Sequence, residues 1–449
     1  MSNNLERDAL IDALTEQYRK QLKEQLPAEN LTLDQIEKAA GTIGKNVSQE
    51  VQKRLTQQET QKPRPKHPKC SCGQVAHYKS QQPRTLVTVH GPLTLVRACY
   101  YCPTCRKSWV PSDLALGLDG GCTTLQVRLW VGWLCALHPF AEAATTLQML
   151  TGVYLSPATL ERISLAMGQS LAGEQKQQAQ AHRNEGLPEP ALKPIRRLYV
   201  GMDGIFVPLR DPWQRDGSRG DLNCRFGECK IGVVYQTFQD EKGRDCRLQQ
   251  SDYVATLSGV EVFEPLLGTL AHQKGHHQAK QVIVLGDGAP WIWQIAAKQF
   301  PGAVQILDFF HACDHLSAYS EARFGKGSTE GQTWQKARQA ELKSGHLSQV
   351  LTAIQSWRPS NEAKRKMRRD TYLYFYNNAE RMRYQTFLEK GYHIGSGVVE
   401  ASCKHIIGQR LDQAGMHWRQ ETAEAIATLR AAQLSSQPPD MNKHCAWPN

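Results

Sequence analysis

Residues 196–210 read RRLYVGMDGIFVPLR, and this stretch predicts the sheet on which the rest of the chain depends. Apolar residues run up to Met202, Asp203 and Gly204 follow, and apolar residues then resume. Because glycine often marks a turn or bend, we expect one strand to end at Asp203 and a second strand to begin beyond the glycine. Asp203 would then be the last residue of a buried strand.

The strand pattern continues toward the C-terminus. A third apolar run is CKIGVVYQTF (229–238), and two shorter runs, QVIVLGD (281–287) and AVQILDF (303–309), alternate with helical segments. Three early strands joined by short turns, followed by alternating helices and strands, predict a mixed α/β sheet covered by helices. This is the element order of a ribonuclease H-like catalytic core.

Three carboxylates occupy positions that such a fold would bring together. Asp203 and Asp287 each follow a predicted strand and precede a glycine, and Glu400 lies in the first turn of a helix that Ser396 can cap. Three neighbouring carboxylates repel one another unless cations lie between them, and oxygen ligands suit Mg²⁺ or Mn²⁺. A pair of such ions serves phosphodiester cleavage. Any single Asp-Gly after a strand is more often an ordinary turn.

A long basic segment separates Asp287 from Glu400 and implies a helical insertion. Residues 356–387 read SWRPSNEAKRKMRRDTYLYFYNNAERMRYQTF, where lysine and arginine alternate with tyrosine and phenylalanine. Cations bind phosphates and aromatic faces stack on unpaired bases, so this segment is a candidate for DNA contact. A solvated basic helix with its aromatic side chains in the core fits the pattern equally well. The candidate residues are Lys364, Arg365, Lys366, Arg368 and Arg369.

Two cysteine pairs flank a predicted hairpin, RTLVTVHGPLTLVRACYYC (84–102). KCSCG supplies Cys70 and Cys72, and YCPTC supplies Cys102 and Cys105. Four thiolates at the ends of two strands are what a structural zinc ribbon needs, although the single residue within the first pair is a short spacing. Cys99 is an alternative ligand, but its position on a strand favours inward packing. The ribbon would either recognise DNA ends or act as a structural brace within the protein.

Composition limits the class of protein. The chain has 449 residues and a formal net charge of +11, which favours a polyanionic partner without proving one. Its thirteen cysteines are an odd number in a chain that has no signal peptide, so metal binding is a better interpretation than disulfide bonds. The absence of a long apolar run predicts a cytoplasmic protein without a membrane span, associated with the nucleoid if its partner is DNA.

Four motifs resemble those of DDE transposases from bacterial insertion sequences of the ISKra type. The similarity extends from about Cys70 to Leu429, and its motifs are MDGIFVPL (202–209), VLGDGAPWIW (284–293), LDFFHACDHL (307–316) and GSGVVEASCKHIIGQRLDQAGMHW (395–418). The resemblance implies that Asp203, Asp287 and Glu400 hold two Mg²⁺ or Mn²⁺ ions on a ribonuclease H-like core that a helical insertion interrupts.

The same motifs supply three further candidates for DNA contact. The resemblance gives Asp308 and His311 the family's Asp-x-x-His arrangement, which would position DNA or a phosphate near the triad; His311 is otherwise an ordinary histidine at a helix start. Lys404 lies one turn after Glu400, where it can neutralise a phosphate or simply pair with that carboxylate. Arg410 in the same motif is another candidate.

The activity that the resemblance implies is DNA transposition. Water would cleave the element ends and the freed 3′-hydroxyl would attack target DNA, with double-stranded DNA as the partner and a homodimer or larger assembly joining two ends. A structure-specific nuclease of the same fold is one alternative. The other is a degenerate or domesticated copy that binds DNA without catalysis, because the final residues SSQPPDMNKHCAWPN depart from the family's basic, aromatic tail.

Changes in composition predict the domain boundaries. Residues 141–171 indicate two helices, the second capped by Ser156 with Pro157 first in the helix, which is either a helix-turn-helix or a simple packing pair. We expect a helical arm at 1–62, a zinc ribbon at 66–112, a helical DNA-binding segment at 120–175, the first part of the core at 195–312, the insertion at 313–392, the catalytic helix of the core at 393–432 and a tail at 433–449.

Overall fold

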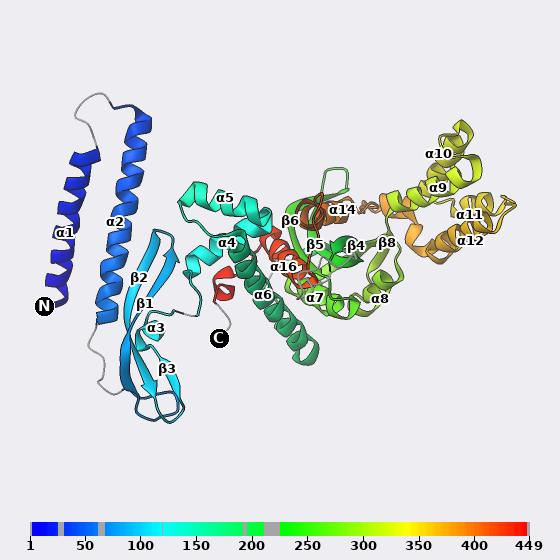
Figure 1. Ribbon diagram of the computed structural model, residues 1–449. Helices are drawn as coiled ribbons and strands as arrows, with labels where there is room; N and C mark the ends of the chain where they lie inside the picture. Colours follow the sequence, from blue (N-terminus) through cyan, green and yellow to red (C-terminus); the bar gives the residue numbers. More distant parts are fainter. Residues whose placement is uncertain are drawn as a thin grey trace. The chain divides into compact units, whose positions relative to one another are not determined.

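The chain divides into two compact units, which are described separately (Figure 1). Unit 1 comprises residues 1–135, 139–163 and 441–449, and unit 2 comprises residues 136–138 and 164–440. The structure is a computed structural model that describes residues 2–25, 31–61, 68–118, 120–191, 195–210 and 225–446. Within those ranges, every helix is too short or too polar to cross a membrane.

Unit 1 combines two long helices with a small antiparallel sheet of order β1-β2-β3. The β1–β2 hairpin turns immediately before Gly91, whose φ of +113° is a conformation that favours glycine. Helix α2 packs on the hairpin, and Thr88 Oγ1 donates a hydrogen bond of 2.9 Å to Gln52 Oε1. These elements are α1 (Ser2–Gln25), α2 (Leu33–Gln61), β1 (His77–Thr88), β2 (Gly91–Cys102) and β3 (Lys107–Trp109).

A group of helices follows the small sheet. Helix α5 ends at Gly152 in the left-handed conformation, and α6 begins at Pro157 with Ser156 Oγ accepting a hydrogen bond of 3.3 Å from Thr159 N. The predicted cap at Ser156 is therefore confirmed. Most of α6 belongs to unit 2. The helices are α3 (Pro111–Ala115), α4 (Leu125–Leu137), α5 (Phe140–Thr151), α6 (Pro157–Glu185) and the short 3₁₀ helix Met441–His444.

Unit 2 is built on a mixed five-stranded sheet of order β6-β5-β4-β7-β8. β4 pairs antiparallel with β5, and β5 with β6, whereas β7 runs parallel to β4 and β8 parallel to β7. The predicted mixed α/β sheet with many helices is thus confirmed. The strands are β4 (Ile195–Leu209), β5 (Arg225–Gln239), β6 (Asp245–Thr256), β7 (Ala279–Gly286) and β8 (Val304–Leu307).

The sequence pattern predicted that β4 ends at Asp203, but the strand is longer. It continues to Leu209, because β5 pairs with it along its length and matches Asp203 with Ile231 and Gly204 with Lys230. Gly204 makes no turn; it lies within the paired strand, with the carboxylate of Glu228 against its backbone. The prediction mistook a close approach for a strand end, and Asp203 lies instead where the neighbouring strand β7 stops.

Helices cover both faces of this sheet. Gly232 faces Phe263 and Leu267 of α7, whereas Gly201, on the opposite face, meets Val399 of α14. Five α-helices, α9 to α13, lie between β8 and α14, in the stretch predicted to be a helical insertion and called the insertion below (Figure 1). The helices are α7 (Val260–Gln273), α8 (Pro290–Gln299), α9 (Phe309–Phe324), α10 (Thr329–Lys343), α11 (Leu347–Gln355), α12 (Glu362–Asn377), α13 (Tyr384–Glu389), α14 (Gly397–Cys403), α15 (Gln409–Leu411) and α16 (Gln420–Leu434).

A buried polar cluster fixes the chain just before α14. The carboxylate of Asp245, which is fully buried, forms an ion pair with Arg197 and accepts a hydrogen bond of 2.5 Å from Tyr199 Oη. His393 joins this cluster, because its backbone N–H donates to Tyr199 Oη over 3.2 Å. A buried charge is tolerated only when it is paired in this way. The cluster therefore ties the segment leading into α14 to strands β4 and β6.

Candidate functional site

Asp203 and Asp287 lie at the same end of the parallel pair β4 and β7. The two strands are in register as far as Gly201 opposite Leu285, and β7 ends at Gly286, one residue before Asp287. Asp203 lies two positions beyond Gly201 and therefore on the same face of β4, which α14 covers. Asp287 begins the loop after β7, and its charge is near enough to raise the pKa of Asp203.

The surroundings of Asp203 oppose its negative charge. Burial raises the pKa of Asp203, two hydrogen bonds to its carboxylate lower it, and the charge of Asp287 raises it again. The donors are Cys403 Sγ, at 3.3 Å, and the backbone N–H of Gly204, at 2.7 Å. The net shift is upward, mainly because of burial; a cation between the two aspartates would stabilise the buried charge and relieve the smaller repulsion from Asp287.

The helical insertion holds the loop that carries Asp287. Tyr374 of α12 donates a hydrogen bond of 3.0 Å to the backbone carbonyl of Asp287, and the Asp287 carboxylate accepts one of 2.9 Å from Ala289 N. Gly288 has a φ of +108°, and a Cβ there would lie 2.8 Å from the Tyr374 ring. His315 of α9 stacks on the same ring with centroids 3.8 Å apart. The insertion thus touches the candidate site directly.

Glu400 lies on the helix that covers the aspartates, but its side chain is turned outward. Val399 and Cys403 of α14 pack onto the sheet, whereas the Glu400 side chain is 65% exposed and forms an ion pair of 2.7 Å with Lys404. Among the described residues, the three carboxylates do not form a group whose ligand atoms all lie within 4.8 Å of one another. The structure brings two carboxylates together and leaves the third on the adjoining helix.

The segment that follows Glu400 is irregular. α14 continues into a π-helical turn, Lys404–Gly408, before α15. Such turns occur often at functional sites. Ser396 does not cap α14 as predicted; its backbone N–H and hydroxyl both donate to the Asp308 carboxylate.

Asp308 and His311 connect the insertion to α14. Asp308 is only 4% exposed and caps α9 by accepting hydrogen bonds from Phe310 N, at 2.5 Å, and His311 N, at 3.0 Å. With its other carboxylate oxygen it holds Ser396. His311 lies close enough to Asp203 for its positive charge to lower the pKa of that carboxylate. The motif predicted to position DNA therefore joins the starts of α9 and α14.

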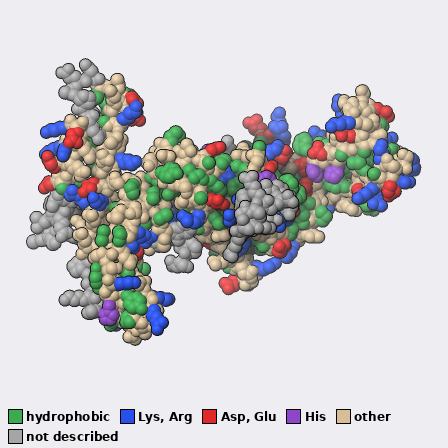
Figure 2. Space-filling view, viewed as in Figure 1, with side chains coloured by type: hydrophobic (Ala, Val, Ile, Leu, Met, Phe, Trp, Pro, Cys, Tyr) green, Lys and Arg blue, Asp and Glu red, His purple; other side chains and the backbone are tan. Residues whose placement is uncertain are grey.

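The cationic candidates differ in accessibility. Arg410 is fully buried with its guanidinium 4.9 Å from the centre of the Trp418 ring, so its expected role in DNA contact is corrected to one in the core. Arg368 is half-buried and donates to Trp357 O. Figure 2 shows Lys and Arg side chains over the helical insertion, with acidic ones among them. The exposed cations of α12 are Lys364, Arg365, Lys366 and Arg369.

The aromatic residues of the same segment are mostly internal. Phe375 and Tyr384 are fully buried, whereas Tyr376 is 58% exposed. A solvated basic helix with its aromatic side chains in the core therefore describes α12 better than a stacking platform for bases.

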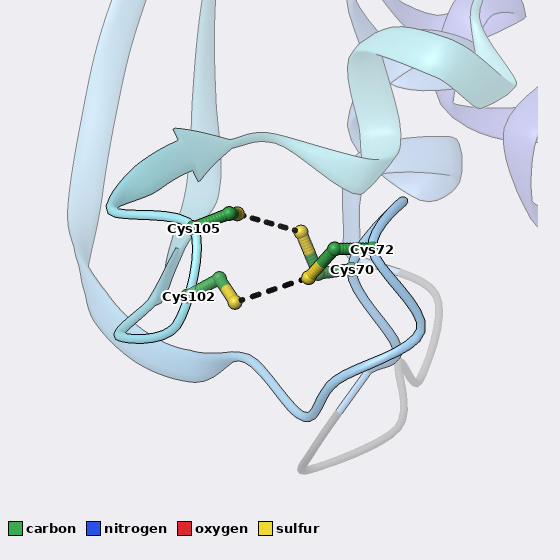
Figure 3. A group of neighbouring side chains, drawn as sticks. All are labelled: Cys70, Cys72, Cys102 and Cys105. Carbon is green, nitrogen blue, oxygen red and sulfur yellow. Dashed lines mark hydrogen bonds between the residues drawn. The ribbon is translucent and has the colours of Figure 1, made fainter.

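The four predicted cysteines of unit 1 converge (Figure 3). Cys70 and Cys105 have Sγ atoms 3.5 Å apart, Cys72 and Cys102 have Sγ atoms 3.7 Å apart, and all four lie within 4.8 Å of one another. A disulfide needs about 2.05 Å, whereas thiolates about 2.3 Å from a tetrahedral zinc ion lie about 3.8 Å apart. This group can hold a metal ion. Cys99 is buried and lies outside it.

The loops around these cysteines favour thiolates. Backbone N–H groups point at the sulfur atoms: chiefly through the one on Cys72 the pKa of Cys70 falls to about 6, and the one on Cys105 lowers the pKa of Cys102. The N–H of Lys107 likewise lowers the pKa of Cys105, but the neighbouring sulfur atoms and burial raise it to about 11, so a metal ion is needed for all four to be thiolates. Each pair is followed by a residue with positive φ, Gly73 at +81° and Arg106 at +56°. Since a metal binds the deprotonated sulfur, this backbone suits a metal site.

Two residues at the aspartates escaped the sequence analysis. Cys403 was given no role in the sequence analysis, yet its thiol donates to Asp203. Tyr374 was one of many aromatics in a basic segment, and nothing in its local pattern marks its contact with Asp287. Helical spacing predicts that Cys403 faces the sheet, but only the tertiary fold supplies the partner.

Comparisons with known proteins give a family and remote structural likenesses. The model described as "Uncharacterised protein family (UPF0236)" matches residues 23–438. No curated protein matches the chain. Among solved structures, the Drosophila P element transposase strand transfer complex aligns with 9% identity and a TM-score of 0.30, over 74% of this chain and 96% of that one. A likeness of that size carries no argument about this protein.

Proposed function

We propose that this chain, which belongs to the uncharacterised protein family UPF0236, is a transposase that cleaves DNA at the ends of an insertion sequence and joins the freed 3′-hydroxyl to target DNA. One observation carries the proposal: Asp203 lies on the central strand β4 beneath the helix that bears Glu400, and Asp287 directly follows the parallel neighbour β7. Carboxylates in this arrangement suit hard divalent cations.

The sheet supports a ribonuclease H-like core. Its order is β6-β5-β4-β7-β8, with three antiparallel strands followed in space by two strands parallel to the central one. An Asp on the central strand β4 and an Asp at the end of its parallel neighbour are where such a core carries its acidic residues. The insertion between β8 and α14 then accounts for the long gap before Glu400.

The residues present fit Mg²⁺ or Mn²⁺. Asp203, Asp287 and Glu400 would hold two ions, which when bound activate the attacking oxygen and stabilise the leaving one. Glu400 has to turn away from Lys404 to join them. An exposed helical pair of this kind is worth only roughly 0.2–0.5 kcal/mol, so the rotation costs little. Lys404 is then free to bind a phosphate.

Other parts of the chain would hold the DNA. The exposed cations of α12 and His311 are the proposed phosphate contacts, and Cys70, Cys72, Cys102 and Cys105 would bind a structural Zn²⁺ in a ribbon that recognises or braces element ends. Joining two ends requires at least two copies, so we propose a homodimer or larger assembly on DNA.

Strand cleavage tests the proposal. The substrate is DNA that flanks the gene of this protein, incubated with Mg²⁺ or Mn²⁺, and a second assay supplies pre-cut ends to detect joining. Asp203→Asn, Asp287→Asn and Glu400→Gln should each lower cleavage by at least about 100-fold, because replacing even an outer-shell partner of a metal ligand costs roughly 10- to 100-fold, while DNA affinity stays nearly unchanged. Glu321→Gln, at an exposed carboxylate of α9, is the control.

Each result of that experiment bears on the function. If one of the three variants still cleaves DNA, the residue replaced in it is not part of the catalytic site. Cleavage without joining would contradict the transposase assignment in favour of a nuclease, and DNA binding without cleavage under all metal conditions would indicate a regulator.

A further inference from the structure

Three histidines of unit 2 cluster away from the candidate active site. His272 lies in the last turn of α7, Gly275 turns the chain with a φ of +77°, and His276 and His277 follow before β7 begins at Ala279. Each histidine offers a ring nitrogen, and these atoms all lie within 4.8 Å of one another.

Two ring nitrogens of the cluster are buried without a hydrogen-bond partner among the described residues. His272 is 4% exposed and His276 is 8% exposed, and within the described ranges the Nδ1 atoms of both have no hydrogen-bond partner. His272 Nε2 lies 3.3 Å from the carbonyl oxygen of Pro188. A carbonyl can only accept, so Nε2 carries the proton and Nδ1 presents a lone pair.

Aromatic packing alone does not account for this arrangement. The His276 ring packs edge-on against Phe300 with centroids 5.5 Å apart, and lies 3.6 Å from the His277 ring. Such contacts bury the ring faces but leave the Nδ1 atoms without a donor. Buried polar atoms in proteins are normally satisfied, and an ion is one of the groups that satisfies them.

We propose that His272, His276 and His277 bind Zn²⁺. Neutral imidazoles are the usual nitrogen ligands of this ion, and a ligating histidine typically donates its other N–H to a carbonyl, as His272 does to Pro188. Three protein ligands leave a fourth position for water. The site is separate from the carboxylates and the cysteines and does not rest on the proposed function.

A metal ion here would fasten one segment of unit 2. Residues 186–191, between α6 and β4, already lie against the cluster, since Gln278 Nε2 donates to Pro190 O over 2.8 Å. Through the Pro188 carbonyl, a metal-bound His272 would pin this segment to the end of α7. Zinc binding should therefore raise the unfolding temperature of unit 2.

Zinc stoichiometry of the purified full-length chain tests the site. The protein is stripped with a chelator, dialysed against Zn²⁺ and analysed by atomic emission. His277→Gln is the main variant because His277 is exposed and its replacement should leave the fold intact, as circular dichroism would verify. It should bind one zinc ion fewer than the wild type, whereas His346→Gln, at an exposed histidine outside the cluster, should bind the same number.

A second experiment distinguishes the histidine site from the cysteine site and uses the Cys102→Ser variant as the starting protein. In Cys102→Ser, Co²⁺ bound at the histidines should give ligand-field bands without sulfur charge transfer, and His277→Gln should remove those bands. Equal zinc content in the wild type and His277→Gln would overturn the proposal, as would a Co²⁺ spectrum in Cys102→Ser that His277→Gln leaves unchanged. Loss of DNA cleavage in a triad variant has no bearing on either result.

Discussion

At the scale of single residues, Gly201 sets how closely α14 approaches the sheet. A Cβ at this position would overlap Val399 and lie 2.9 Å from Val233 Cγ1, and both neighbours are fully packed. The absence of a side chain at Gly201 therefore lets Cys403, one turn beyond Val399, reach Asp203. The geometry of the candidate site depends on this contact.

Gly201→Ala should destabilise the protein because the added methyl has no room. Overpacking of this kind costs about 1–3 kcal/mol. Gly173→Ala in α6 is the matched control, since a Cβ there meets nothing within 4 Å and alanine favours a helix. Urea unfolding curves measure both. Equal stability of the two variants would show that α14 is not held against β4 in this way.

At the scale of elements, the insertion does more than add surface to the protein, because it also holds the loop of Asp287 in place. Tyr374 of α12 bonds the Asp287 carbonyl, and Asp308 at the start of α9 holds Ser396 at the start of α14. The insertion can therefore transmit a change in its own position to both sides of the site.

On the proposed function, Tyr374→Phe should slow DNA cleavage by about 2- to 10-fold, as expected from the loss of one hydrogen bond worth ~0.5–1.5 kcal/mol. Tyr376→Phe removes a hydroxyl from an exposed tyrosine of the same helix and should have no effect. Single-turnover cleavage rates compare them. If Tyr374→Phe cleaves DNA at the wild-type rate, the contact between the insertion and Asp287 does not contribute to cleavage.

The sequence predicted which helices and strands exist better than where they begin and end. Hydrophobic runs indicated the sheet, but the continuation of β4 past Asp203 depends on pairing with β5, a partner distant in the chain. Arg410 looked like a surface cation because burial on Trp418 is a tertiary contact. The nearness of Asp203 to Asp287 follows from the parallel pairing of β4 with β7, which local pattern alone could not establish.

At the scale of the whole molecule, the two units have separate sources of stability. Unit 1 has a small sheet and the four cysteines, whereas unit 2 has the large core around β4, β5 and β7. The cysteine loops have only a small core of their own, formed by Cys70, Ala76, Tyr100 and Cys102. Removal of a metal ion from the cysteines should therefore loosen this end of unit 1 first.

Cys102→Ser should lower the unfolding temperature of unit 1 and expose it to limited proteolysis while unit 2 stays resistant. A metal at these cysteines contributes folding free energy directly, and serine is a poor zinc ligand. Cys122→Ser replaces an exposed cysteine of the same unit and should change neither property. Identical proteolysis of both variants would argue against a structural metal at the cysteines.

Anomalous diffraction from crystals soaked in Mn²⁺ tests the central claim most directly. The account predicts manganese peaks bound by Asp203 and Asp287, with the Glu400 carboxylate turned from Lys404 toward them. Saturating Mn²⁺ with no peak at either aspartate, in a protein that still cleaves DNA, would contradict it.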